Sequence, residues 1–501
     1  MLGLVPLADA IATADMKRRI RSFDARQARY RAAYGVTADT PVTGWAGQQD
    51  AQASHAAATG ASVATTSGTT GDPKRVAMTR ARLRSFKLGS ASAGVRTWAR
   101  LGIPSPALFV LANLDDDDSF SSLVLRNARP WPSRLHGLVE PARYLTAPPV
   151  RALVERYGPT ATRAWLMALS DPGIVYATNP STLAVFFARL LDDPRVGELA
   201  RAAPSPEVVR RVAAPGHAQR LAALATTPRD VPGWMPSLRA WCSWDGGYVA
   251  PYVDQVRRHL PPDRFTHVPM FSMSTETVET LTVFDGATPR FLPLAPGVLY
   301  EFLREHDTDR SELLLGPREL EEGASYTLVV SDPYGLRRYQ TEDLFLCAGH
   351  LHGLPDLRFQ RRRGLAFSFT GEKLTGEQVT AAFDAARAAH PLHDLQLALF
   401  PSWPDGETTP GYRLVLAHTA APPEVDVALV VAAVQRVLRE QNNELAAKLD
   451  SGRLGPLEPV VLPYPELAAA LDHRAGGWES QFKLAPLYTR TWQALGLEDP
   501  P

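Results

Sequence analysis

The stretch GIVYATNPSTLAVFFARLLDD, residues 173–193, predicts a buried strand, a turn and an amphipathic helix in direct succession. Asn179 is placed to cap this helix and Pro180 to occupy its first turn, where the missing N–H of proline does no harm. A second apolar strand is expected in PALFVLANL, residues 106–114. Such alternation of apolar strands and amphipathic helices favours an α/β fold with substantial parallel pairing.

Further elements are expected on both sides of this unit. Residues 17–35 predict a basic amphipathic helix that ends at Gly35, whereas residues 39–64, rich in Ala, Gly, Thr and Pro, indicate irregular chain. Residues 74–79 favour a short strand and residues 81–102 a helix.

The sequence changes in character toward the C-terminus. From residue 326 it consists of short β-like runs, and then a strand at 412–418 precedes a helix with an apolar stripe at 425–449. We therefore expect a large domain of mixed sheets and helices at residues 1–366 and a small α+β domain at residues 367–501.

Composition excludes several classes of function. The chain has 501 residues, with 53 Lys and Arg against 53 Asp and Glu, so its net charge favours neither nucleic acid nor a membrane surface as a partner. No run approaches the roughly 18–20 apolar residues of a membrane span, and the N-terminus has the wrong charge order for a signal peptide. Two cysteines without metal-ligand spacing suit a reducing compartment. We expect a monomer in the cytoplasm, and the excess of Arg over Lys favours a bacterial origin.

The stretch TTSGTTGDPK, residues 65–74, is dense in hydroxyls and glycines and ends in Pro-Lys. Its glycines are three positions apart, which fits neither the Walker pattern nor a dinucleotide fingerprint. A Ser/Thr/Gly linker is the alternative, although a linker has no need of the final Pro-Lys. Open backbone amides, hydroxyls and one cation can surround the phosphates of ATP. The candidate phosphate-binding residues are Thr66, Ser67, Gly68, Thr69, Thr70, Gly71 and Lys74.

The spacing of this loop resembles the signature of the adenylate-forming enzymes. Within that superfamily the chain resembles the GH3 acyl-acid amido synthetases, with motifs in the family's order over about residues 60–490. The resemblance implies a large adenylate-forming N-terminal domain and a small mobile C-terminal domain, hinged near residues 367–373. It also implies ATP and Mg²⁺.

Two further segments carry the resemblance in the large domain. FSMSTETV, residues 271–278, matches a family element that places Thr275 at the nucleotide or acyl phosphate and Glu276 on Mg²⁺. Residues 326–349 resemble an element in which Asp343 takes both ribose hydroxyls, as suits a bidentate acceptor, and Arg338 also aligns. The departures from the family pattern in this element are Arg337, Gln340 and Glu342, and Glu342 adds a negative charge beside the nucleotide site.

The C-terminal part contributes cationic candidates. Residues 359–379 align with the family's hinge, where Arg361 or Arg362 would contact ribose or phosphate and Lys373 matches a family lysine. Near the end, the Gln-Phe-Lys context makes Lys483 a candidate for neutralising the α-phosphate.

The acid substrate is expected near the segment at residues 241–261. Trp244, Tyr248 and Phe271 would line a pocket for an aromatic or hydrophobic acyl group. The resemblance implies ATP-dependent activation of a small carboxylic acid, followed by transfer to an amine or amino acid. The alternatives are transfer to a thiol (CoA or a carrier protein) or a hydroxyl, and a degenerate member that binds nucleotide without turnover.

Overall fold

The computed structural model describes most of the chain. Its described residues are 5–66, 74–105, 107–111, 141–246, 250–307, 310–362, 366–392, 395–404, 406, 408–418, 425–464, 466–467, 471 and 485–496. The chain divides into two compact units, and the smaller begins at Arg362 apart from a short segment before β2. Each unit is described by itself.

A four-stranded parallel sheet confirms the α/β prediction for the larger unit. Its strands lie in the order β3 (Leu108–Val110), β4 (Ile174–Tyr176), β5 (Ala240–Ser243) and β6 (Thr266–Pro269). After β4, helix α8 (Pro180–Asp192) begins as the sequence predicted, because the Asn179 side chain accepts a hydrogen bond of 2.9 Å from the N–H of Ser181.

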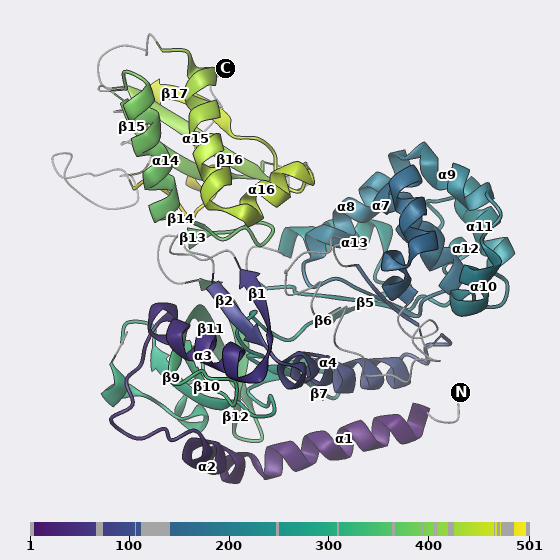
Figure 1. The fold of residues 1–501 in the computed structure, drawn as a ribbon, viewed down its shortest axis with the longest axis horizontal. Coiled ribbons are helices and arrows are strands. Elements are labelled where there is room, and N and C mark those ends of the chain that lie inside the picture. The colour runs from purple at the N-terminus through teal and green to yellow at the C-terminus, as the bar shows by residue number, and fades with distance from the viewer. Residues whose placement is uncertain are drawn as a thin grey trace. The chain divides into compact units, whose positions relative to one another are not determined.

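Helices gather beside this sheet, as Figure 1 shows for α7–α13. They are α7 (Pro148–Ser170), α9 (Pro194–Arg201), α10 (Pro206–Val212), α11 (His217–Thr226), α12 (Val231–Trp234) and α13 (Ala250–His259). Arg220 of α11 is buried and donates to the carbonyls of Ala168 and Leu169 at the end of α7. It thereby satisfies carbonyl groups that a helix end leaves without partners.

The second large sheet is antiparallel, in the order β12 (Leu354–Arg362), β11 (Tyr339–Leu351), β10 (Ser325–Ser331) and β9 (Leu299–Arg304). The β runs predicted from residue 326 onward are β10, β11 and β12. A hairpin of β7 (Leu281–Asp285) and β8 (Thr288–Leu292) precedes them. Short 3₁₀ turns lie at Pro141–Thr146, Ser311–Leu313 and Pro317–Glu319.

The N-terminal region differs from the prediction in two places. The helix expected over residues 17–35 is two helices, α1 (Val5–Arg21) and α2 (Phe23–Ala33), with a break at Ser22 that lets the side chain of Phe23 enter the core. The region 39–64, expected to be irregular, contains a 3₁₀ turn (Trp45–Gln48), helix α3 (Gln49–Thr59) and strand β1 (Ser62–Thr66). Alanine, the strongest helix former, outweighs the Gly and Thr signals there.

Strand β2 (Lys74–Met78) pairs with β1, and α4 (Arg80–Arg100) follows it, close to the predicted bounds. The core of the larger unit joins α1 and α2 to the strand pairs β1–β2 and β7–β8 and to the antiparallel sheet. None of the described helices is long and apolar enough to cross a membrane.

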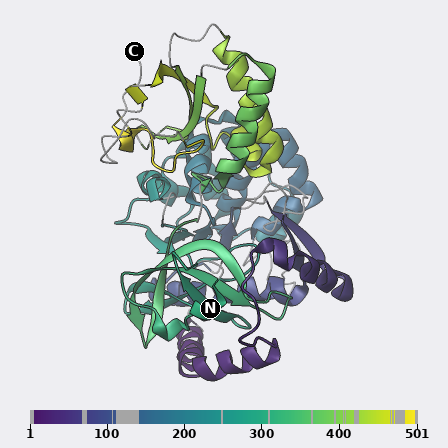
Figure 2. The ribbon, with the colours of Figure 1, turned by 90° about the vertical axis from the view of Figure 1, so that its left-hand side faces the viewer.

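The described part of the smaller unit has a three-stranded sheet and three α-helices. β15 (Leu395–Ser402) pairs antiparallel with β16 (Gly411–His418), and β16 pairs parallel with β17 (Glu458–Pro463). Helices α14 (Gly376–Ala389) and α15 (Val427–Gln441) lie side by side (Figure 2). The bridge β13–β14 (Ala366–Phe367 with Leu374–Thr375) precedes α14, and a 3₁₀ turn spans Gln493–Leu495.

The helix predicted over residues 425–449 is divided in two. Asn442 ends α15 and caps α16 (Asn443–Asp450), because its side chain accepts a hydrogen bond of 2.9 Å from the N–H of Leu445. The apolar stripe nevertheless stays on one buried side, since Val430, Val434, Leu438 and Leu445 are all buried.

Candidate functional site

Glu276 lies in a tight turn between two chain segments that pair with each other. Met273 and Val278 form an antiparallel bridge, and the N–H of Ser274 donates to the carbonyl of Thr277 at 3.0 Å. Thr275 is half-buried in this turn and Glu276 is buried. The Tyr339 hydroxyl donates to one carboxylate oxygen of Glu276 at 3.3 Å. The turn, which we call the Glu276 hairpin (residues 272–280), thus fixes this carboxylate at its tip.

Asp343 lies where the ladder between β10 and β11 shifts its register. Thr327 pairs with Leu344 and Val329 with Gln340, so residues 341–343 of β11 oppose a single residue of β10. Such an irregularity turns side chains away from the normal alternation and is frequent next to binding sites. Asp343 and its neighbour Glu342 are both half-buried in it.

A third carboxyl group, that of Glu279, belongs to the Glu276 hairpin. Its side chain is buried and accepts a hydrogen bond from the Ser272 hydroxyl. Burial above all, and then the negative charges of Asp343 and Glu276, raise the pKa of Glu279 to about 8. The sequence prediction included Glu276 and Asp343 but not Glu279.

Two buried threonine hydroxyls lie in these same segments, that of Thr277 in the Glu276 hairpin and that of Thr341 in the irregular part of β11. The hydroxyls of Thr277 and Thr341 are buried and have no hydrogen-bond partner among the described residues. Such groups cost free energy unless something binds them.

The donor set fits a Mg²⁺ ion that is shared with phosphate. No three acidic, His or Cys side chains among the described residues are arranged to hold a metal by themselves. Mg²⁺ commonly binds through one or two carboxylates together with substrate phosphates. Glu276, with the hydroxyls beside it, meets that requirement.

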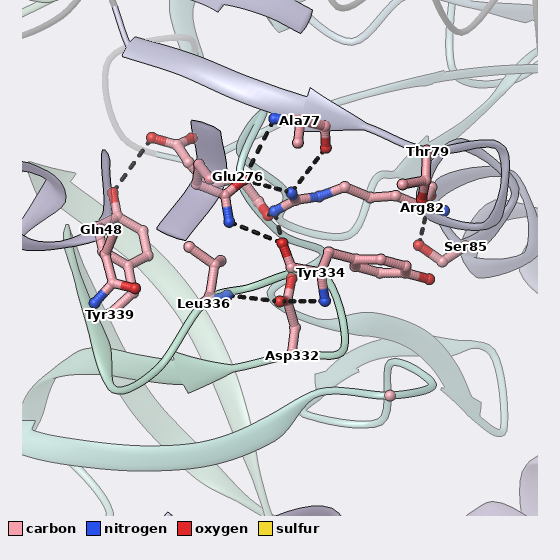
Figure 3. A network of polar contacts seen from close by, with 12 residues as sticks. Gln48, Ala77, Thr79, Arg82, Ser85, Glu276, Asp332, Tyr334, Leu336 and Tyr339 are labelled. Carbon is pink, nitrogen blue, oxygen red and sulfur yellow. Dashed lines mark hydrogen bonds and ion pairs between the residues drawn. The ribbon is translucent and has the colours of Figure 1, made fainter. Parts of the chain in front are cut away.

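Arg82 is the centre of a buried polar network that the sequence prediction missed (Figure 3). Its guanidinium donates to the Gln52 side chain at 3.1 Å, to the carbonyl of Ala77 at 3.0 Å and to the carbonyl of Glu276. It also contacts the carboxylate of Asp332 at 3.4 Å. Nothing in the local pattern of residues 79–83 distinguishes Arg82 from the exposed arginines that surround it.

Arg338 is engaged within the protein. Its guanidinium forms a two-bond ion pair with Glu301, with both N–O distances at 3.0 Å, and donates to the carbonyls of Thr40 at 2.7 Å and Ala38 at 3.3 Å. Arg31 adds a second ion pair to Glu301. The backbone of Arg338 has a φ of 41°, a conformation rare for residues other than glycine.

Two of the predicted acyl-pocket residues, Trp244 and Phe271, lie at the carboxyl ends of the parallel strands. Trp244 follows β5, and its indole N–H donates to the carbonyl of Phe271, after β6, at 3.2 Å. The Tyr176 hydroxyl at the end of β4 contacts the sulfur of Met270 at 2.9 Å. This edge of a parallel sheet is where α/β folds commonly bind ligands. Tyr176 is a pocket candidate that the sequence prediction did not include.

Lys373 lies in the smaller unit, in a loop with unusual backbone geometry. Its φ is 49° and that of Gly371 is 102°. Between them Glu372 is buried and accepts hydrogen bonds from the N–H groups of Phe369 (2.7 Å) and Thr370 (2.8 Å) and from the Tyr412 hydroxyl (2.5 Å). This internal carboxylate holds the loop in its conformation.

The remaining candidates are only partly within the described residues. Lys74 is the first residue of β2 and is buried. Thr66 is the last residue of β1 and Arg362 the last residue of β12, but the structure does not describe their side chains. Outside the described residues altogether are Ser67, Gly68, Thr69, Thr70, Gly71, Tyr248 and Lys483.

Comparison with known proteins agrees with the resemblance inferred from the motifs. Residues 291–362, which include Asp343, match the GH3 family central domain. An indole-3-acetic acid-amido synthetase of Arabidopsis thaliana, GH3.3, is 25% identical over 193 residues, 36% of this chain and 31% of its own. The jasmonoyl–L-amino acid synthetase JAR4 of Nicotiana attenuata is 30% identical over 193 residues, 37% of this chain and 33% of its own.

The matched stretches span about a third of the length of these relatives. A solved structure of the acyl acid amido synthetase AtGH3.15 in complex with 2,4-DB has 14% identity and a TM-score of 0.45, over 95% of this chain and 86% of that one. The match to the family model and the partial similarity to these curated relatives bear out the resemblance to the GH3 family in the central part of the chain.

Proposed function

We propose that this protein is an AMP-forming ligase, which activates a carboxylic acid with ATP and transfers the acyl group to an amine or amino acid. The observation that carries the proposal is the hydrogen bond of 3.3 Å between the Tyr339 hydroxyl and the buried Glu276, because Tyr339 begins β11, the strand of Asp343, within the segment that matches the GH3 central domain. The relatives GH3.3 and JAR4, whose names state amido synthetase and amino acid synthetase activity, support the same reaction.

In the first half-reaction, a carboxylate oxygen of the acid attacks the α-phosphorus of ATP and pyrophosphate leaves. Asp343 accepts hydrogen bonds from the ribose hydroxyls, while Thr275, Lys74 and the loop at residues 66–71 hold the phosphates. Glu276 would hold Mg²⁺, which when bound offsets the negative charge of the phosphates. Preformed electrostatics and positioning of this kind supply most of the rate enhancement.

In the second half-reaction, the amine nitrogen attacks the acyl carbon, the carbon–oxygen bond to AMP breaks, and the nitrogen loses a proton. Trp244, Phe271 and Tyr248 line the acyl pocket. In the smaller unit, Lys373 and Lys483 are our candidates for neutralising the α-phosphate, and Arg362 for contacting the nucleotide. We assign a structural role to Arg338, because its guanidinium is hydrogen-bonded to both carboxylate oxygens of Glu301.

We further infer a bacterial enzyme that acts as a monomer in the cytoplasm, without nucleic-acid or membrane partners. The balanced charge and the two free cysteines support this inference.

Isotope exchange between labelled pyrophosphate and ATP tests the first half-reaction, with a panel of aromatic and aliphatic acids. We expect exchange with at least one acid, and AMP release equal to amide formation once amino acids are added. Exchange with none of the acids would overturn the proposal. AMP release with CoA or a phosphopantetheine thiol, but with no amine, would overturn the assignment of the acceptor.

A further inference from the structure

Arg82 is placed by the start of helix α4. The Thr79 side chain caps this helix by accepting a hydrogen bond of 3.1 Å from the N–H of Arg82. Capping fixes the first turn of the helix and directs Arg82 into the protein, where 1% of it is exposed. Its guanidinium lies 5.3 Å from the centre of the Tyr334 ring, a distance typical of a cation–π contact.

The guanidinium connects parts of the chain that are distant in sequence. It reaches strand β2 through the carbonyl of Ala77, and helix α3 through the side chain of Gln52. It reaches the Glu276 hairpin through the carbonyl of Glu276 itself, and the turn after β10 through Asp332 (Figure 3).

In the described part of the chain, no backbone ladder joins β2 to the Glu276 hairpin or to the turn after β10. β2 pairs with β1, and the Glu276 hairpin bridges to itself. Asp332 accepts hydrogen bonds from the N–H groups of Tyr334 (2.8 Å) and Leu336 (3.0 Å), which closes the turn that leads into β11 and Asp343. One side chain therefore links strand β2, the backbone of residue 276 and the turn that leads into the strand of Asp343.

Burial of a guanidinium is costly unless its donors are matched. The two Nη groups of Arg82 have acceptors, whereas its Nε is buried without a hydrogen-bond partner among the described residues. The Gln52 amide oxygen accepts from both Arg82 and the N–H of Ala77, and the Gln52 NH₂ donates to the carbonyl of Tyr334 at 2.9 Å. The planar fork of arginine can serve several acceptors at fixed angles, which a lysine ammonium cannot.

We propose that Arg82 is a positioning residue for the nucleotide site, which holds Glu276 in register with β2 and with the strand of Asp343. It contacts the backbone of Glu276 and not its carboxylate, so it acts through the placement of that residue. This inference rests on the proposed function in that the ligand is Mg²⁺-ATP.

The test compares Arg82→Lys with Arg220→Lys as a matched control. Arg220 is also a buried arginine in the larger unit, and it donates to four backbone carbonyls, those of Ala168, Leu169, Ala214 and Pro215. Both variants lose a guanidinium fork in the interior, but only Arg82 contacts the candidate site. Binding of α,β-methylene-ATP is measured by calorimetry across a series of Mg²⁺ concentrations, after circular dichroism has shown that each variant is folded.

We expect Arg82→Lys to weaken binding of the analogue at least tenfold and to raise the Mg²⁺ concentration required for half-maximal binding. Arg220→Lys should stay within twofold of the wild type in both quantities, even if its unfolding temperature falls by as much as that of Arg82→Lys. A folded Arg82→Lys protein that binds within twofold of the wild type would overturn the inference.

Asp332→Asn serves as a second variant if Arg82→Lys does not fold. It weakens the ion pair between Asp332 and the Arg82 guanidinium, so the affinity for the analogue should fall at least threefold. A loss of less than threefold would contradict the inference. If the wild type binds the analogue but exchanges pyrophosphate with no acid, the proposed function fails while the binding comparison still decides the role of Arg82. If the wild type does not bind the analogue, both are overturned.

Discussion

At the scale of single residues, Glu279 makes stability depend on pH in an unusual direction. Its pKa is raised from the ordinary value of 4.5 to about 8, first by burial and then by Asp343. Between these two values the folded protein keeps a proton that the unfolded chain has released. Glu279 therefore contributes stability that is fully present below pH 4.5 and is lost as the pH rises toward 8.

A Glu279→Gln variant tests this dependence. Because glutamine stays neutral, we expect its unfolding temperature to fall less than that of the wild type between pH 5 and pH 8. Thermal unfolding at several pH values measures this difference, in which the contributions of all other groups largely cancel. Parallel profiles for the two proteins would show that Glu279 does not titrate in this way.

Asp343 and Glu342 are adjacent, equally charged and both half-buried, which makes them a matched pair. Asp343→Ala removes the proposed acceptor of the ribose hydroxyls. A hydrogen bond to a charged group contributes about 1.5–3 kcal/mol, so we expect kcat/KM for ATP to fall by roughly ten- to a hundredfold or more. Glu342→Gln should change it less than about threefold. The pyrophosphate exchange assay measures both, and equal losses would refute the specific role of Asp343.

At the scale of elements, the loop before β14 depends on Glu372. Its carboxylate accepts from two backbone N–H groups and the Tyr412 hydroxyl, all in the interior. Glu372→Ala leaves these donors unpaired, and each costs about 1–3 kcal/mol. We expect the free energy of unfolding to fall by about 3 kcal/mol or more.

Urea unfolding measures this loss, with Glu377→Ala as control. Glu377 is the same residue type, lies five positions on in the first turn of α14 and is exposed. A surface carboxylate at a helix N-terminus contributes only about 0.3–1 kcal/mol. Similar losses in the two variants would contradict the anchoring role of Glu372.

Elements also show what the sequence could and could not predict. The strand–turn–helix at residues 173–193 was predictable because strand, cap and first-turn proline are all local signals. The roles of Glu276 and Asp343 come from motif spacing and stay predictions. Arg82 and Glu279 were missed because their roles depend on contacts with segments more than 60 residues away, namely Glu276 for Arg82 and Asp343 for Glu279. The ion pair between Arg338 and Glu301 could not be predicted either, because Glu301 lies 37 residues earlier in the chain.

At the scale of the whole molecule, the smaller unit has a hydrophobic core of its own. This core joins β15, β16 and β17 through buried residues that include Phe400, Val415, Val460 and Trp492. A segment of about 140 residues can bury enough surface to be stable alone. We therefore expect a fragment of residues 362–501 to fold by itself.

Circular dichroism and urea unfolding of this fragment test whether it has regular secondary structure and unfolds cooperatively. Every acceptor and donor that Glu372 uses lies within the fragment. Because a local interaction keeps its free energy when distant parts are removed, Glu372→Ala should destabilise the fragment and the full chain by the same amount, within about 0.5 kcal/mol. An unfolded fragment, or a fragment insensitive to Glu372→Ala, would show that the smaller unit depends on the larger one for its structure.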